Sequence, residues 1–389
     1  MRLAMVVTGG LHPGGREQVV PSLLALFSRL ARRHEVHAFA LRHLPRATTY
    51  NLRGFIVHDL GRPSAPLGLG RWAQARALRR ALKAAGPFDL VHGFWGDPAG
   101  LLAARAGRRF GIPAVVTCDS GEFVSRPEID YGSQRSARGR SAIAEACRLA
   151  SYVHVCTTYM KDLAGQHGVP AAVIPIGTTT PGSIVEGEQT RNEPGVFAPR
   201  TKSEPGILRI LQVASLSRVK NQRLAIDAVA ILAKSLRVHL DLIGEDTLGG
   251  ELQAHAVTLG LANRITFHGF VPHADLPSHF GRADVYLQTS LHEAAGVSVL
   301  EAASFGVPVV GTRVGYIADW APGSAAAVDG RTPGAFAAAI ESGARDAVGQ
   351  QMRAASAHRW ATTHDADWTA AQVEKMYGDL CGSRIRPPA

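Results

Sequence analysis

The sequence predicts an α/β protein with two doubly wound parallel-sheet domains, and three observations support this prediction. Short apolar segments alternate with longer amphipathic segments along most of the chain, as in parallel sheets flanked by helices. Residues 181–206 interrupt this pattern with a stretch rich in Gly, Pro, Glu, Thr and Ser. The length of 389 residues suits two domains, since a domain usually has about 100–200 residues.

In the first half, the expected strands are short apolar runs bounded by Gly, Pro or Asp, as in strands buried on both faces. They are Arg2–Val7, Glu35–Phe39, Gly54–His58, Asp89–His92 and Ile112–Thr117. A helix is expected over Val19–Leu30 because its apolar residues recur on one helical face. We assign residues 1–180 to this first domain.

The second half repeats the pattern over residues 207–363. The expected strands are Leu208–Val213, Val238–Ile243, Arg264–Phe267, Asp284–Leu287 and Val307–Gly311. Residues 181–206 are expected to form a linker or mobile loop. The amphipathic segment Asp367–Tyr377 predicts a helix. This helix either packs on the second domain or crosses back to the first. We expect ligands at the carboxyl ends of the strands, in a cleft between the domains.

The composition is that of an ordinary globular protein, with 46% hydrophobic and 19% charged residues. No apolar run reaches the roughly 18 residues of a membrane-spanning helix, and the N-terminus lacks the features of a signal peptide. A cytoplasmic location is therefore expected. The four cysteines show no metal-ligand spacing and are expected to be reduced thiols.

The net charge of +10 is unevenly distributed. Residues 1–180 contain 23 Lys and Arg against 11 Asp and Glu, whereas residues 181–389 contain 19 against 21. A basic half beside a nearly neutral half indicates an anionic partner for the first domain. Nucleic acid, an acidic membrane surface and a phosphorylated substrate all fit, and a solvated Arg-rich surface is the alternative.

The segment Thr289–Glu301 carries the strongest chemical pattern. Gly296 permits a tight turn before a helix, whose first amides (Val297, Ser298 and Val299) and positive dipole end suit a diphosphate. Glu301 could accept hydrogen bonds from a ribose diol, and Glu293 could reach sugar hydroxyls. Two alternatives compete. Ser298 and Glu301 also fit a helix capping box, and Glu293 could be a solvated loop residue.

The Glu-x7-Glu spacing, followed by the segment 303–312 with Gly306, Pro308 and Gly311, resembles the retaining glycosyltransferases of family 4, which have the GT-B fold. The resemblance implies that Glu301 holds the nucleotide ribose and that Glu293 contacts the donor sugar. It also implies that the C-terminal helix, residues 364–389, crosses back to the first domain.

Further positions agree with this resemblance. The loop 8–20 is rich in glycine, and the family comparison places Gly14 and Gly15 opposite the donor; a simple strand-to-helix turn is the alternative. Lys220 matches the family lysine for the pyrophosphate. The family arginine position is occupied by Ser215, so Arg218 is a substitute candidate; both cations could instead be solvated.

Two more segments complete the resemblance. Val271 lies in the Gly269–Pro272 segment, which resembles the family segment beside the nucleotide base. Asp119 stands where the family has an active-site histidine. It could orient an acceptor hydroxyl, but a carboxylate cannot supply a positive charge. His92 is expected near the same sheet edge, although a packed core histidine is the simpler interpretation.

These observations predict a retaining glycosyltransferase that moves a sugar from a UDP- or GDP-sugar to a hydroxyl acceptor, for instance in glycolipid or polysaccharide synthesis. No cluster of metal-ligating carboxylates is visible, so neither a metal nor another cofactor is expected. The acceptor is expected to be anionic or lipid-linked, with peripheral contact between the first domain and the inner membrane face. A non-catalytic sugar-nucleotide-binding protein is the main alternative. A nucleic-acid-binding protein is less well supported because no recognition motif accompanies the charge.

Overall fold

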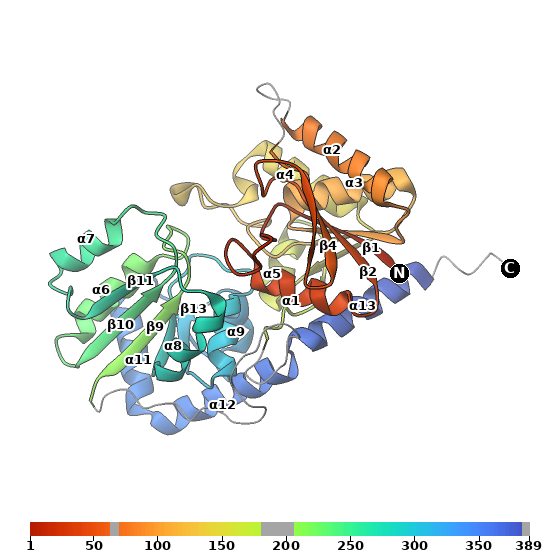
Figure 1. The fold of residues 1–389 in the computed structure, drawn as a ribbon. Helices are drawn as coiled ribbons and strands as arrows, with labels where there is room; N and C mark the ends of the chain where they lie inside the picture. The colour runs from red at the N-terminus through yellow and green to blue at the C-terminus, as the bar shows by residue number, and fades with distance from the viewer. Residues whose placement is uncertain (63–69, 180–205, 383–389) are drawn as a thin grey trace. The chain divides into compact units, whose positions relative to one another are not determined.

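The computed structural model describes residues 1–62, 70–179 and 206–382 (Figure 1). The chain forms two compact units. The first comprises Met1–Ile176 with Ala366–Ala389, and the second comprises Gly177–Asp365. Of the predicted linker, residues 181–205 lie outside the described part of the chain.

The first unit is built on an eight-stranded sheet in the order β3-β4-β2-β1-β5-β6-β7-β8. All neighbouring strands are parallel except the antiparallel β3–β4 pair. The strands are β1 (Arg2–Val7), β2 (Glu35–Ala40), β3 (Thr48–Leu52), β4 (Phe55–Asp59), β5 (Leu90–Phe94), β6 (Ala114–Thr117), β7 (Tyr152–Val155) and β8 (Ala172–Val173).

Helices connect these strands, and several begin at recognisable signals. Pro21 opens α1 at its first turn, and the hydroxyl of Thr157 caps α5 by accepting from the amide of Met160. The helices are α1 (Pro21–Leu30), α2 (Gly70–Ala85), α3 (Leu101–Phe110), α4 (Ala137–Leu149), α5 (Thr158–Gln166) and α13 (Ala366–Gly382), with a π-helical turn, η1 (Gly96–Gly100), before α3.

The strand predictions for this half are confirmed within two residues at each end, and Arg2–Val7 is confirmed at both ends. Three strands escaped prediction: β3, β7 and β8. Strand β3 has the sequence TTYNL and three exposed residues, because it is an edge strand whose side chains largely face water. Strands β7 and β8 have only four and two residues, too few for a periodic pattern to stand out.

The C-terminal helix α13 belongs to the first unit and packs beside α1 (Figure 1). The buried Arg29 forms an ion pair with Asp367 at 3.0 Å. The hydroxyl of Thr369 donates to the carbonyl of Pro175 at 2.8 Å. Tyr377 is fully buried within the core of this unit.

The second unit has a six-stranded parallel sheet in the order β11-β10-β9-β12-β13-β14. Its strands are β9 (Leu208–Val213), β10 (Val238–Ile243), β11 (Ile265–Gly269), β12 (Val285–Gln288), β13 (Val309–Thr312) and β14 (Ala326–Val328). The order reverses between β9 and β12, which makes the carboxyl ends of these two strands the expected ligand position in such a sheet.

The helices of the second unit are α6 (Gln222–Leu232), α7 (Glu251–Thr258), α8 (Pro277–Arg282), α9 (Val297–Ser304), α10 (Gly315–Trp320), α11 (Pro333–Arg345) and α12 (Ala347–Thr363). A 3₁₀ turn, η4 (His273–Asp275), precedes α8. The five predicted strands are confirmed within two residues at each end, and the three-residue β14 was missed. No helix in the described part of the chain is long and apolar enough to cross a bilayer.

Candidate functional site

Lys220 and Glu293 meet at the carboxyl ends of two neighbouring strands of the second unit. Lys220 follows β9 and Glu293 follows β12, and these strands are paired in the sheet. The ammonium of Lys220 lies 2.6 Å from Oε1 of Glu293, and the hydroxyl of Ser290 donates to the same oxygen at 2.7 Å. The lysine and glutamate side chains remain 26% and 12% exposed, so this ion pair is open to a ligand.

Hydrogen bonds between the two loops fix this pair in place. The amide of Leu291 donates to the carbonyl of Val219 at 2.7 Å, and the hydroxyl of Thr289 donates to the carbonyl of Asn221 at 2.9 Å. Thr289 itself is buried, and its hydroxyl also receives a hydrogen bond from the side-chain Nε2 of Gln212. The loops after β9 and β12 therefore form one hydrogen-bonded unit. Its backbone fixes the positions from which the side chains of Lys220 and Glu293 extend.

Gly296 turns the loop into α9, as predicted. Its φ of +84° is in the left-handed region, and a Cβ there would lie 2.9 Å from Oε1 of Gln288. Gly296 is the N-cap residue of α9, and no side chain caps the helix. The amides of Val297 and Ser298 therefore lie in the first turn of the helix, where they have no partner within the helix. They also lie at the positive end of the helix dipole.

Glu301 lies in the second turn of α9, where its largely buried carboxylate contacts Nε2 of His273 at 2.7 Å. The capping-box alternative is wrong because Gly296 is the N-cap residue and Ser298 is inside the helix. The Ser298 hydroxyl instead receives a hydrogen bond from the buried Tyr286 at 2.6 Å. The glutamate is thus oriented by an imidazole from the segment after β11.

Two other predicted residues of the second unit lie in flanking segments. Arg218 forms an ion pair with Glu251 of α7 at 3.6 Å, with side chains 64% and 48% exposed. In this structure its partner is therefore Glu251 rather than the Lys220–Glu293 pair. Val271 is half-buried between β11 and η4, two residues before His273.

In the first unit, Gly14 and Gly15 lie in the loop between β1 and α1. Gly15 has a φ of +65°, and its amide donates to the carbonyl of His12 at 2.9 Å. The amide of Gly14 donates to Nδ1 of the same histidine at 3.2 Å. The loop is therefore a tight backbone turn at the carboxyl end of β1, and the position of Gly14 and Gly15 opposite a donor stays a prediction.

Asp119 follows β6 in a setting that disfavours its charged form. Burial, and secondly the nearby carboxylate of Glu122, raise the pKa of Asp119 to about 8. Among the described residues, no donor reaches its buried Oδ1. The Asp119 carboxyl is therefore largely protonated at neutral pH and can donate a hydrogen bond, although it supplies no positive charge in place of the family histidine.

Glu122 is a buried acid whose importance sequence reasoning missed. It is 3% exposed and accepts hydrogen bonds from the amides of Gly96 at 2.9 Å and Ser120 at 2.7 Å. A Cβ on Gly96 would lie 2.9 Å from Cγ of Glu122 and 2.6 Å from Cδ1 of Ile143. Burial raises the pKa of Glu122. The only sequence signal was an acid three residues beyond Asp119.

His92 is a packed core histidine, and it has no free ring nitrogen. Its Nδ1 lies 2.6 Å from the hydroxyl of Tyr377, and its Nε2 lies 2.6 Å from the hydroxyl of Thr117. Burial, together with the neighbouring His154, lowers its pKa well below the usual value. The interpretation of His92 as a packed core histidine is therefore confirmed. Among the described residues, no group of three or more His, Cys, Asp or Glu is arranged to hold a metal ion.

Two family models match the chain, and together they cover most of it. The model described as "Glycosyl transferase 4-like domain" matches residues 19–177, and "Glycosyl transferases group 1" matches residues 199–359. The chain belongs to the GT4-type glycosyltransferases. The first match includes Asp119, and the second includes the Lys220, Glu293 and Glu301 positions.

Sequence relatives of this glycosyltransferase align over part of their length. The chain is 34% identical to the 2-deoxystreptamine glucosyltransferase of Streptomyces kanamyceticus over 108 residues, 28% of either protein. It is 27% identical to the D-inositol 3-phosphate glycosyltransferase of Arthrobacter sp. over 276 residues, 64% of this chain and 58% of that enzyme. The chain thus matches less than two thirds of the length of each of these relatives.

Solved structures show the fold of this glycosyltransferase. Sucrose-phosphate synthase from Thermosynechococcus elongatus aligns with a TM-score of 0.77 and 16% identity, covering 98% of this chain and 100% of that one. Alr3699/HepE from Anabaena, in complex with UDP and glucose, aligns with a TM-score of 0.71 and 20% identity, covering 97% and 100%. At such identities the likeness shows the fold alone, which is GT-B with two parallel-sheet α/β domains.

Proposed function

We propose that this chain is a retaining glycosyltransferase that transfers a sugar from a nucleoside-diphosphate donor to a hydroxyl acceptor. The observation that carries the proposal is the Lys220–Glu293 pair, next to the start of α9, at the carboxyl ends of β9 and β12. A cation and helix amides suit a diphosphate, and two carboxylates can accept hydrogen bonds from the hydroxyls of the ribose and the sugar. The retaining outcome rests on the resemblance of the Glu-x7-Glu segment to family 4.

The leaving diphosphate needs positive charge as its bond to the sugar breaks. In the structure, the charge of Lys220 is balanced by Glu293. A bound diphosphate would share this ammonium and accept hydrogen bonds from the amides of Val297 and Ser298. These groups are held by the backbone scaffold described above, so they stabilise the developing charge with little rearrangement. Arg218 would add a second charge if it exchanged Glu251 for phosphate.

The two glutamates would divide the rest of the donor between them. Glu301 is fixed by His273, so its second carboxylate oxygen is available to a ribose diol. Glu293 lies in the loop and would accept hydrogen bonds from hydroxyls of the transferred sugar. Val271, close to His273 in sequence, would lie beside the base. The structural neighbours from Anabaena were solved with UDP and with UDP-glucose, so UDP-glucose is the first donor to test.

We assign the acceptor to the first unit, where Asp119 would contribute, whereas Gly14 and Gly15 would face the donor. A protonated Asp119 would donate to an acceptor oxygen, and its conjugate base would accept the acceptor proton. The excess of basic residues in this part of the chain favours an anionic acceptor. The Arthrobacter relative is named for D-inositol 3-phosphate, which makes a phosphorylated polyol a sensible first acceptor.

A direct assay tests the proposed function. The purified chain is incubated with UDP-glucose, GDP-mannose and other nucleotide sugars, and released nucleoside diphosphate and the anomeric configuration of any product are measured. Donor-dependent release of UDP or GDP with retained configuration supports the proposal. Tight nucleotide binding without turnover on any acceptor would support the non-catalytic alternative, which is motivated by Asp119 and Ser215.

Helices α2 and α3 support a further part of the proposal, peripheral binding to an anionic membrane surface. Trp72 is 62% exposed, and the guanidinium of Arg76 lies 5.3 Å from the centre of its ring. The groove between the helices is lined by these residues with Arg79, Arg109 and the partly exposed Phe110. Exposed aromatic rings flanked by cations suit the interface of a bilayer with acidic headgroups.

Vesicle flotation tests this membrane contact. We expect the chain to float with phosphatidylglycerol vesicles and not with phosphatidylcholine vesicles. Replacing Trp72→Ser and Arg76→Gln together should abolish flotation. Met352→Ser removes another exposed apolar side chain, on α12 of the second unit, and serves as the matched control that should still float. Equal flotation of both variants would remove this surface from the proposal.

A further inference from the structure

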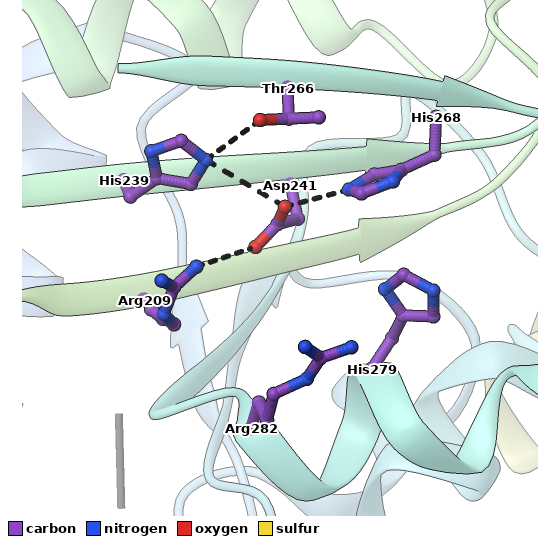
Figure 2. A pocket seen from close by; sticks show the side chains of 7 residues that line it. All are labelled: Arg209, His239, Asp241, Thr266, His268, His279 and Arg282. Carbon is purple, nitrogen blue, oxygen red and sulfur yellow. Dashed lines mark hydrogen bonds and ion pairs between the residues drawn. The ribbon is translucent and has the colours of Figure 1, made fainter. Parts of the chain in front are cut away.

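A polar pocket lies on one face of the sheet in the second unit (Figure 2). Strands β9, β10 and β11 supply its floor, with Arg209 beside His239 and Asp241 beside Thr266 in the strand register. Helix α8 faces this floor. The pocket has a volume of about 330 Å³, which is at the lower end of the range of roughly 300–1,000 Å³ for ligand sites.

The polar lining of this pocket differs from the usual doubly wound sheet, in which apolar side chains cover both faces. On β10, Val238, Leu240 and Leu242 point into the apolar core, whereas His239 and Asp241 point to the other face. The polar residues of β11 alternate in the same way. These strands therefore give up apolar burial on one face in favour of charged and polar side chains.

The charge in this pocket is predominantly positive. Five basic side chains line it: Arg209, His239, His268, His279 and Arg282. They surround a single carboxylate, Asp241, which contacts Nε2 of His268 at 2.7 Å. Arg209 and His239 approach the same carboxylate only at 3.7 Å. Even with all three imidazoles neutral, two guanidinium groups exceed one carboxylate.

Two of the basic side chains, those of His279 and Arg282, come from α8. Within the described part of the chain, neither forms an ion pair with Asp241. Figure 2 shows His279 and Arg282 on the helix, facing the strand residues. The imidazole of His279 stacks edge-on against His268 at 4.8 Å between ring centres. Nε of Arg282 donates to the carbonyl of Ser278 in its own helix, which leaves its terminal nitrogens for another acceptor. The pocket thus offers donors that Asp241 does not satisfy.

We infer that this pocket binds a tetrahedral dianion, either free phosphate or sulfate or the phosphoryl group of a small molecule. Guanidinium and imidazole donors converging from three strands and a helix match the several oxygens of such an anion. A metal ion is the weaker fit, because the described residues contain no group arranged for metal coordination. The volume exceeds that of one phosphate ion and leaves room for a small carrier or water.

Proton uptake should accompany binding. Burial lowers the pKa of His239 and of His279, so both favour the neutral form when the pocket is empty. A dianion would favour their protonated forms, and binding should therefore strengthen as the pH falls. Asp241 is the carboxylate that lines the pocket, and it acts on both His239 and His279. Asp275 lies outside the lining but also acts on His279, and both carboxylates remain in every variant below.

This inference is independent of the proposed function. The pocket lies on the face of the sheet, whereas Lys220 and Glu293 lie at the strands' carboxyl ends. The two sites share no side chain, although the segment from β11 to α8 supplies His268 and His279 to one and His273 to the other. A saturating nucleoside diphosphate should therefore leave anion binding in place.

Calorimetric titration of the full chain with sodium sulfate in low-salt buffer tests the inference. Sulfate stays doubly charged across the range, so pH changes report on the protein. We expect one saturable site that binds at least about fivefold more tightly near pH 5.5 than near pH 8, and equally well with excess UDP present. Arg282→Gln and Arg209→Gln should each weaken binding at least about tenfold. Arg345→Gln on α11, whose side chain is 83% exposed, should change nothing.

Further measurements distinguish a free anion from a phosphorylated metabolite and check that each variant is folded. Inorganic phosphate and glucose 6-phosphate are compared at pH 8; tighter binding of the sugar phosphate assigns a phosphorylated metabolite, and equal binding assigns the free anion. His279→Gln should reduce the pH dependence, and thermal unfolding checks that each variant is folded. No saturable binding, equal binding by the Arg282→Gln and Arg345→Gln variants, or displacement by UDP would overturn the inference. So would zinc binding that depends on His279 in the absence of sulfate binding.

Discussion

The ammonium of Lys220 and the carboxylate of Glu293 lie 2.6 Å apart although 73 residues separate them in the chain. The pair is formed because β9 and β12 are neighbours at the point where the strand order of the second sheet reverses. Lys220 lies in the loop after β9 and Glu293 in the loop after β12, and the two loops are hydrogen-bonded to each other. The pair therefore places opposite charges where a diphosphate and its sugar would both be bound.

Replacing Glu293→Gln tests the role of this carboxylate in turnover. The amide keeps the size of the side chain and a hydrogen-bonding oxygen but removes the charge that the proposed function places beside the donor sugar. We expect kcat to fall at least about tenfold, a barrier increase of roughly 1.4 kcal/mol. UDP affinity should change less, and could even increase because Lys220 loses its competing carboxylate.

Initial rates with UDP-glucose and calorimetric titration with UDP measure these two quantities. Ser290→Ala is a useful comparison, because it removes one hydrogen bond to the same oxygen while keeping the charge; its effect on kcat should be smaller. A Glu293→Gln enzyme with unchanged kcat would place Glu293 outside the reacting groups.

Glu301→Ala should weaken donor binding. A carboxylate that accepts hydrogen bonds from a ribose diol contributes about 1–3 kcal/mol, so the UDP dissociation constant should rise roughly fivefold or more. Titration of wild type and variant with UDP measures this change. Glu341→Ala on α11 is the control, since Glu341 pairs with Arg345 on the helix surface. Unchanged affinity for UDP in the Glu301 variant would contradict the ribose role.

The sequence was sufficient to predict the strands that carry this site. Lys220 and Glu293 each follow a strand with strong apolar character, and Gly296 marks the turn into a helix. Those features depend on local pattern, which is readable without the fold. The short or polar strands β3, β7, β8 and β14 lack such a pattern and were missed.

Features that depend on contacts between distant segments could not be predicted. The contact between His273 and Glu301 joins the turn η4 to helix α9, and the capping-box alternative was equally compatible with the sequence. The protonation of Asp119 is set by burial and by Glu122. The sequence shows the acid three residues away, but it does not show the burial. The polar face of β10 did have one, because VHLDLI alternates where a doubly buried strand would be continuously apolar.

Asp119 should make the stability of the fold depend on pH. Its pKa is about 8 when folded and near the ordinary value of 3.8 when unfolded. Between these values the folded chain holds a proton that the unfolded chain has lost, so the free energy of unfolding falls as the pH rises from about 4 to 8. The contribution is at most about 1.4 kcal/mol per pH unit and ends above the folded pKa.

Urea unfolding of wild type and Asp119→Asn at pH 6, 7 and 8 isolates this contribution. The variant cannot titrate at this position, so its unfolding free energy should fall less steeply with pH, and near pH 8 it should be at least as stable as wild type. Glu122 is present in both proteins, so its own raised pKa cancels in the comparison. Parallel pH profiles for the two proteins would mean that Asp119 is already ionised at pH 6.

Tyr377→Phe should loosen the attachment of α13 to the first unit. The Tyr377 hydroxyl lies 2.6 Å from Nδ1 of His92, whose other nitrogen bonds Thr117, and all three side chains are buried. Removing the hydroxyl leaves a polar nitrogen unpaired in the core, which costs about 1–3 kcal/mol. Because burial keeps the His92 pKa far below its usual value, the imidazole cannot compensate by taking up a proton near neutral pH.

Hydrogen exchange measured by mass spectrometry localises this effect better than a global unfolding curve in a chain of two units. Peptides from α13 and β5 should lose protection in the Tyr377→Phe variant, whereas peptides from β9 to β14 should not. Tyr152→Phe on β7 is the control, since the hydroxyl of Tyr152 makes no hydrogen bond within the described part of the chain. Equal loss across both units would show that the effect is not local, and unchanged exchange in α13 would show that the apolar contacts of this helix suffice to hold it.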